Sequence, residues 1–184
     1  MRLALMPPDL DRWLPDPALR VAHRRWSRVS PEELWDAART VRVRDTGLLG
    51  RLIHWRIPGT SSEQRFDELF SSPPFIELER GDTSLVSGLV GRIWTLRRDY
   101  PALSDPEEFR EFAQPGTARV IFATWISESA LNVEARVETF GSRGRVGLAA
   151  VRPLISSFQH LIGSEGIEAA VRAAEASAPS ARAR

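Results

Sequence analysis

The side chains of this chain best suited to acid–base or metal chemistry are three histidines, and they are far apart. His23, His54 and His160 fall in three different predicted elements, so none of them has the spacing of metal ligands. The chain has no Cys, which excludes thiolate ligands, disulfides and thiol catalysis. We expect no metal site. His160 lies beside the apolar face of a predicted helix, where it is either an acid or base at a cavity mouth or a boundary histidine bonded to backbone.

Arg92 and Trp94 form a second candidate group, two residues apart in a predicted strand. Alternation along a strand places both on one face. There the Arg would bind an anion and the Trp would form an aromatic wall. The alternative is a solvent-facing Arg92 that lies over Trp94 or pairs with Glu77.

Glu134 and Arg136 occupy one face of a predicted strand, opposite Val133 and Ala135. We expect them to form a surface or inter-strand ion pair that contributes ~0–1 kcal/mol. A role in ligand binding is the alternative. The short side chains of Val133 and Ala135 would leave space beneath a helix, unless neighbouring side chains fill that space as ordinary core.

No motif marks a nucleophile or a nucleotide site. The chain has no Gly-x-Ser-x-Gly elbow. Gly88 and Gly91 do not form a dinucleotide fingerprint, and the segment 47–50 lacks the Gly-Lys-Ser/Thr end of a phosphate loop. The sequence therefore predicts no cofactor.

A long helix near the end of the chain is the element expected to position these groups. Between Ser142 and Ser177, apolar residues recur at steps of three and four, which predicts a helix with one apolar face. Pro153 stands inside the pattern and should bend the helix. The apolar residues that we expect the helix to direct toward a cavity are Leu154, Phe158, Leu161 and Ile162.

The preceding part of the chain has the pattern of antiparallel strands with short helices. The predicted strands are 20–29, 75–80, 84–96, 117–127 and 130–140, and the predicted helices after the first strand are 31–40 and 47–55. The last strand alternates apolar and polar residues, which predicts one buried and one solvated face. The sequence therefore indicates an α+β fold with helices on one face of one sheet.

Length and composition are those of one globular domain. We expect an irregular leader over 1–19, a domain over 20–177 and a disordered tail over 178–184. The net charge is +1 and the Arg residues are scattered among acids, so we expect no nucleic-acid interface. No apolar run reaches the ~18 residues of a membrane span, none at the N-terminus suits a secretory signal, and we expect a cytoplasmic protein.

Three local patterns resemble a known family. They are Gly88 to Trp94, Glu108 to Val120, and Leu131 to Val137, the last followed by Arg143, Arg145 and a helix with Pro153 and Ser156. The chain resembles an uncharacterised bacterial family in the START/SRPBCC superfamily, which includes polyketide cyclases and birch-pollen-allergen-like proteins. The resemblance covers roughly 21–175.

The resemblance implies a helix-grip fold, in which a curved antiparallel sheet wraps around the long C-terminal helix and a cavity lies between them. Two short helices follow the first strand. It implies no single reaction, because superfamily members bind lipids, carry hormones, cyclise polyketides or serve as scaffolds. Where a bulky aromatic pair is expected near the start of the last helix, this chain has Gly147 and Leu148, so its cavity would be wider or differently shaped.

We therefore expect a protein that binds a small apolar or amphipathic molecule between the sheet and the last helix. One alternative is a cyclase- or aromatase-type enzyme in which His160, Arg92 or Glu77 moves protons. Another is a ligand-free interaction module, a candidate homodimer with exposed Trp13, Trp26 and Trp55. The expected ligand-binding residues are Arg92, Trp94, Val133, Ala135, Leu154, Phe158, His160 and Leu161.

Overall fold

The computed structural model describes residues 6–57, 59–95, 97 and 100–177, except for the side chains of 154–164. The expected tail at 178–184 lies outside the described residues. The elements in chain order are η1 (Leu10–Arg12), β1 (Leu19–Trp26), α1 (Pro31–Thr40), η2 (Val43–Asp45), α2 (Gly47–Arg56), α3 (Phe66–Phe70), β2 (Ile76–Gly81), β3 (Ser84–Gly91), α4 (Pro106–Glu111), β4 (Ala118–Ser127), β5 (Ala130–Thr139) and α5 (Gly141–Ser177).

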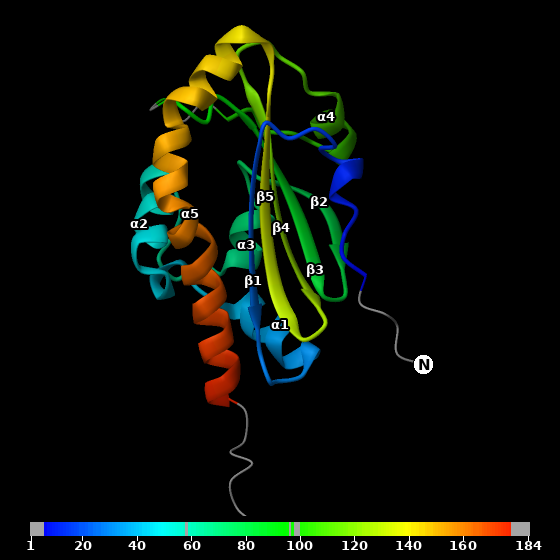
Figure 1. The fold of residues 1–184 in the computed structure, drawn as a ribbon, viewed down its shortest axis with the longest axis vertical. Helices are drawn as coiled ribbons and strands as arrows, with labels where there is room; N and C mark the ends of the chain where they lie inside the picture. The colour runs from blue at the N-terminus through cyan, green and yellow to red at the C-terminus, as the bar shows by residue number, and fades with distance from the viewer. Residues whose placement is uncertain (1–5, 58, 96, 98–99, 178–184) are drawn as a thin grey trace, which may run out of the picture.

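The strands form one 5-stranded sheet in the order β1-β5-β4-β3-β2, in which all neighbours are antiparallel. β5 lies between β1 and β4, so the first strand of the chain pairs with the last. The expected α+β class is confirmed. Figure 1 shows α5 running along the sheet, with α2 beyond it and α4 on the other side of the sheet.

The helix after β1 begins where the sequence predicts. Ser30 accepts a hydrogen bond from the backbone N–H of Glu33 (3.3 Å), and the Glu33 carboxylate accepts one from the backbone N–H of Ser30 (3.0 Å). Pro31 occupies the first turn, where its missing N–H costs nothing. This capping box satisfies two backbone N–H groups at the start of α1.

β3 is shorter than expected, because it ends at Gly91 instead of residue 96. Gly91 has a φ of 136°, in the region that residues with a Cβ rarely adopt. The chain therefore leaves the sheet at this glycine. Arg92 and Trp94 follow in the connection, so the expectation that a strand aligns them is wrong.

Both faces of the sheet are covered at β5, which corrects the prediction of a solvated face on this strand. Helices α1, α2, α3 and α5 cover one face, which we call the inner face. The other, outer face packs against the N-terminal segment and α4. The buried core on the outer face consists of Leu10, Trp13, Leu14, Leu78, Val86, Val90, Phe109, Ile121 and Ala123.

The N-terminal segment explains why polar residues of β5 are buried. Trp13 and Leu14 are 3% and 0% exposed, and the Trp13 indole donates to Glu79 (3.4 Å). Beneath this segment Glu134 and Arg136 are 3% and 8% exposed. The expected surface ion pair is therefore a buried one.

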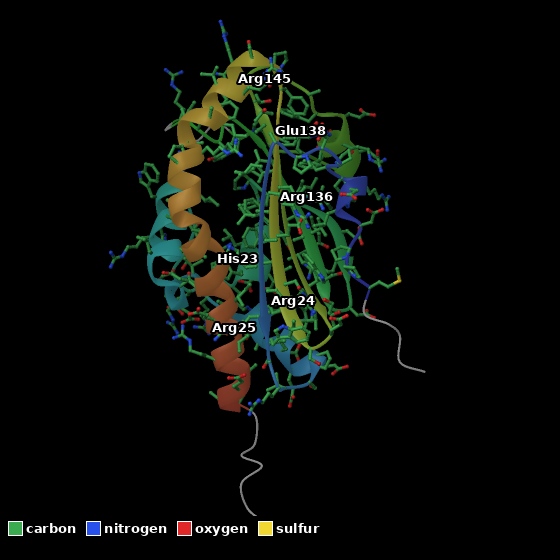
Figure 2. The ribbon with its side chains drawn as sticks, in the orientation of Figure 1. His23, Arg24, Arg25, Arg136, Glu138 and Arg145 are labelled. Carbon is green, nitrogen blue, oxygen red and sulfur yellow. The ribbon has the colours of Figure 1, made fainter. Side chains whose placement is uncertain are left out.

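The buried pair belongs to a small network. Arg136 donates to Glu134 (2.6 Å) and to the backbone carbonyl of Leu14 (3.1 Å), and it also pairs with Asp11. Arg20 on β1 donates to the second oxygen of Glu134 (2.8 Å). Figure 2 shows Arg136 and Glu138 on β5, on the half of the molecule where η1 and α4 lie. The network ties η1 to the centre of the sheet.

The carboxylates around Arg136 compensate for its burial. Burial alone lowers the pKa of this guanidinium, but the hydrogen bonds and negative charges of Asp11 and Glu134 outweigh it, so the pKa of Arg136 lies above its ordinary value. A buried charge that loses its partner is strongly destabilising. The network is therefore a structural element of the outer face.

Helix α5 is continuous over Gly141–Ser177 and contains Pro153. Figure 1 shows that it curves along the sheet. Its first turns contribute Leu148 to one core cluster, together with Leu19, Val120 and Val137. Its last turns contribute Ile167, Ala170, Val171 and Ala174 to a second cluster, with α1 and Leu131. Among the described residues, no helix has both the length and the apolar composition of a membrane span.

Gly147 on α5 lets Trp94 pack against the helix backbone. A Cβ at Gly147 would lie 2.3 Å from the Trp94 ring, closer than atoms can approach. The indole thus occupies the place where a side chain of α5 would otherwise stand. Trp94 therefore fills the space at Gly147, and this glycine does not by itself widen the cavity.

Replacing Glu134 with Ala should lower the free energy of unfolding by about 3 kcal/mol, because it leaves Arg136 buried without its nearest carboxylate. Urea denaturation monitored by circular dichroism measures this. The control is Glu107→Ala, which removes the exposed pair with Arg110 and should change stability by about 1 kcal/mol or less. Equal effects of the two substitutions would contradict the structural role of the network.

Replacing Gly147 with Ala should destabilise the protein by about 1–2 kcal/mol, because the clash with Trp94 outweighs the better helix propensity of Ala. Gly166→Ala on the same helix is the matched control. The nearest atom to its Cβ would be in Phe66 at 3.5 Å, an ordinary contact, so this change should be neutral or stabilising by up to about 1 kcal/mol. Urea unfolding compares the two variants, and the reverse order of stability would refute the packing of Trp94 on α5.

Candidate ligand cavity

The floor of the candidate site is the inner face of the sheet. The pairing registers of β1, β5, β4 and β3 align inner-face residues in three rows across these strands. The first row is Leu19, Val137, Val120 and Leu89; the second is Val21, Ala135, Phe122 and Ser87; the third is His23, Val133, Thr124 and Leu85. The first and third rows lie four residues apart along each strand, which is about 13 Å.

Side chains in the middle of this floor are not fully covered. All four residues of the first row are buried. By contrast, Ala135 and Val133 on β5 are only partly buried, as are Phe122 and Thr124 on β4. β5 and β4 have a strand on each side, so residues on their covered face would be buried if the layers closed on each other. Their partial exposure therefore reflects a space between the sheet and the helices.

That space is a cavity of about 330 Å³. This volume is at the lower end of the range for small-molecule sites, ~300–1,000 Å³. Residues on α1, α2, α3 and α5 form the roof. They are Trp35, Ala38, Arg39, Leu49, Leu52, Ile53, Arg56, Phe66, Asp67, Leu69, Phe70, Gly166, Ile167 and Ala170.

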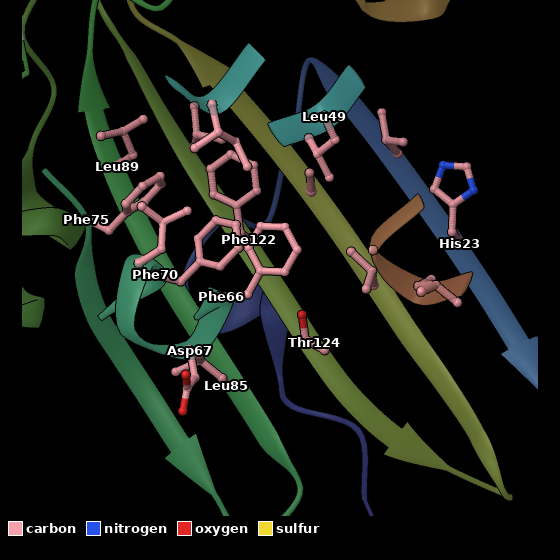
Figure 3. Close-up of a pocket in the computed structure, with 18 of the residues that line it drawn as sticks. His23, Leu49, Phe66, Asp67, Phe70, Phe75, Leu85, Leu89, Phe122 and Thr124 are labelled. Carbon is pink, nitrogen blue, oxygen red and sulfur yellow. The ribbon is translucent and has the colours of Figure 1, made fainter. Parts of the chain in front are cut away.

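Aromatic rings close the β3 side of the cavity. Phe70 packs against Phe66, Phe75 and Phe122, with ring centroids 5.9, 5.0 and 5.3 Å apart. Figure 3 shows this cluster over the floor, with His23 on the far side of the pocket. The wall near β3 and β4 is therefore aromatic, and it stands opposite His23 on β1.

A carboxylate from α5 holds α2 in the roof. Glu165 accepts hydrogen bonds from the backbone N–H groups of Leu49 (2.9 Å) and Leu48 (3.4 Å). These are unpaired donors of the first turn of α2, and the preceding Thr46 makes no side-chain cap. The negative charge also complements the positive end of the helix dipole. Glu165 thus links two roof helices.

A few polar groups interrupt the apolar lining. At the third row, His23 and Thr124 face the cavity, and the Nε2 atom of His23 is buried without a hydrogen-bond partner among the described residues. Arg56 and Tyr100 stand at the first-row end, because Arg56 bonds to Ile93 just after β3, and Ile93 and Tyr100 pack against the cluster that contains the first row. The two polar ends are separated by the second row, which is apolar except for Ser87 on β3.

Arg56 is fixed by the connection that follows β3. Its guanidinium donates to the carbonyls of Thr95 (2.7 Å) and Ile93 (3.0 Å) and to the Tyr100 hydroxyl (2.6 Å). All three acceptors are neutral. The arginine therefore brings a positive charge to the cavity wall and fastens this connection to α2.

The structure brings together only part of the predicted site. Val133 and Ala135 line the cavity floor. Arg92 is exposed and lies outside the described lining, and Trp94 packs against Gly147. The remaining predicted residues are Leu154, Phe158, His160 and Leu161, whose side chains lie outside the described residues.

The other groups considered as chemical candidates are engaged elsewhere or exposed. Glu77 accepts hydrogen bonds from Arg80 (2.6 Å) and Ser71 (3.0 Å), and the bond from Arg80 is the main reason why the pKa of Glu77 lies below its ordinary value. His54 is exposed on α2. Within the described part of the chain, no three His, Asp or Glu side chains gather as metal ligands.

Sequence reasoning missed the polar groups that do line the cavity: His23, Arg39, Arg56, Asp67, Tyr100 and Thr124. His23 and Thr124 had a usable signal, because each stands on the apolar side of its strand's alternation. Arg56 had none, since an arginine in the last turn of a short helix usually points to solvent.

No family model matches this chain, and no curated protein or solved structure matches it either. The cavity is therefore the feature from which a function can be inferred.

Proposed function

We propose that this protein binds a small apolar or amphipathic molecule in the cavity between the inner face of the sheet and the helices. The observation that carries the proposal is the partial exposure of Ala135 and Val133 on a strand flanked on both sides and covered by helices. Burial of apolar surface would drive binding, at ~25 cal/mol per Å² removed from water.

The architecture supports an assignment to the helix-grip class. The long C-terminal helix runs along one face of an antiparallel sheet, and two helices, α1 and α2, follow the first strand. These features agree with the START/SRPBCC resemblance, and we propose membership of that superfamily on this basis. Such a fold supports binding but does not select a reaction.

The cyclase alternative has less support. It requires at least two titratable groups that converge on a substrate. Of the groups considered for this role, Arg92 is exposed, Glu77 is paired with Arg80, and the side chain of His160 lies outside the described residues. The cavity does contain His23 and Asp67, but Figure 3 shows them on opposite sides of the pocket. We therefore favour binding over catalysis.

The interaction-module alternative requires exposed tryptophans, and one of the three considered is buried. Trp13 is 3% exposed, whereas Trp26 and Trp55 are 58% and 50% exposed. The two exposed rings lie on different elements, at the end of β1 and on α2. Arg24 covers the Trp26 ring at 4.3 Å. These observations do not favour a homodimer over ligand binding.

Ala135→Phe tests the proposal by filling the cavity floor. The variant should weaken binding of aminoanthracene, a neutral apolar fluorophore, by roughly tenfold or more, because the ring occupies the ligand's volume. Fluorescence titration measures the affinity, and thermal unfolding checks that the variant is folded.

The matched control is Ala22→Phe, which places the same ring on an exposed position of β1 on the outer face. This variant should bind the fluorophore as the wild type does. Binding that is absent in the wild type, or that survives unchanged in a folded Ala135→Phe variant, would rule out this cavity as the binding site.

A further inference from the structure

The charged side chains of the cavity differ in how their charges are compensated. Arg39 pairs with Asp36. Asp67 accepts a hydrogen bond from the backbone N–H of Glu68 (2.9 Å) and interacts electrostatically with Arg80. Arg56 contacts no carboxylate among the described residues, and its hydrogen bonds go only to carbonyls and a phenol. It is the lining cation without a counter-ion in the described part of the chain.

Not all N–H groups of the Arg56 guanidinium are used in these hydrogen bonds. A guanidinium has five N–H groups, and the bonds to Thr95, Ile93 and Tyr100 use three of them. The remaining two have no acceptor among the described residues. Because those bonds fix the plane of the group, the free donors are held in place before any ligand arrives, which lowers the entropic cost of binding.

We propose that the ligand is a carboxylic acid with an apolar body, and that Arg56 binds its carboxylate. This inference rests on the proposed function, since it assigns the head group of the molecule in the same cavity. A carboxylate would supply both a negative charge and acceptors for the two N–H groups that have none among the described residues, and charge-assisted bonds of this kind are about twice as strong as neutral ones.

The position of Arg56 sets the orientation of the ligand. The head group lies at the first-row end beside Tyr100 and Ile93, and the apolar body extends over Ala135 toward the third row. That path is about 13 Å long and is lined mainly by aliphatic and aromatic side chains. The arrangement fits an elongated monocarboxylate better than a compact or strongly polar one.

The test compares decanoate with decanol, which has the same chain length but a neutral head. Each displaces aminoanthracene from the wild type, Arg56→Met and Arg56→Lys. We expect the wild type to prefer decanoate, Arg56→Met to lose roughly tenfold or more in decanoate affinity while keeping decanol binding, and Arg56→Lys to restore part of the preference. Added salt should weaken decanoate binding only.

Arg92→Met is the control, because it removes an exposed arginine outside the described cavity lining; its decanoate-to-decanol ratio should equal that of the wild type. If Arg56→Met weakens both ligands equally, Arg56 only holds the connection after β3, and the carboxylate assignment is overturned. The carboxylate assignment is also overturned if Arg56→Met has the same decanoate-to-decanol affinity ratio as the wild type. If neither compound displaces the fluorophore in the wild type, or both still bind to Ala135→Phe, the cavity proposal itself fails and not only the head-group assignment.

Discussion

The cavity depends on the way in which α5 is fastened to the rest of the fold. Near its start, Leu148 packs with the buried first row of the sheet, and Trp94 lies against the backbone at Gly147. Near its end, Ile167 and Ala170 pack with α1 and Leu131. Because interiors are normally close-packed, partly exposed residues between two such contacts mean that the helix and the sheet are held apart there.

The opposite face of the sheet provides the rigidity that such a space requires. The N-terminal segment buries Glu134 and Arg136 against β5, and both carboxylate oxygens of Glu134 are bonded to arginines. Apolar side chains and hydrogen-bonded ion pairs fill the outer face, whereas the inner face borders the cavity. A cavity lowers the free energy of unfolding. The packed outer face offsets this loss by contributing much of the folding free energy.

Much of the framework could be predicted because its signals are local. The capping box of Ser30 and Glu33 begins α1, and alternation along β5 identified Val133 and Ala135 as inner-face residues. The burial of Glu134 could not be predicted, because it depends on the N-terminal segment packing over β5. The apolar residues of that segment, Leu10, Trp13 and Leu14, are too few to form a periodic pattern in the sequence. Arg56 was missed for a similar reason: its acceptors lie 37–44 residues later in the chain, so only the tertiary structure reveals its role.

The most direct test of the central claim is a crystal structure of the protein grown with a brominated decanoate, with the bromine located by its anomalous signal. The geometry predicts bromine between Ala135 and the roof helices, with the carboxylate at Arg56. An interior closed by side chains, or bromine found only on the surface of the protein, would contradict the claim that the sheet and α5 enclose a ligand site.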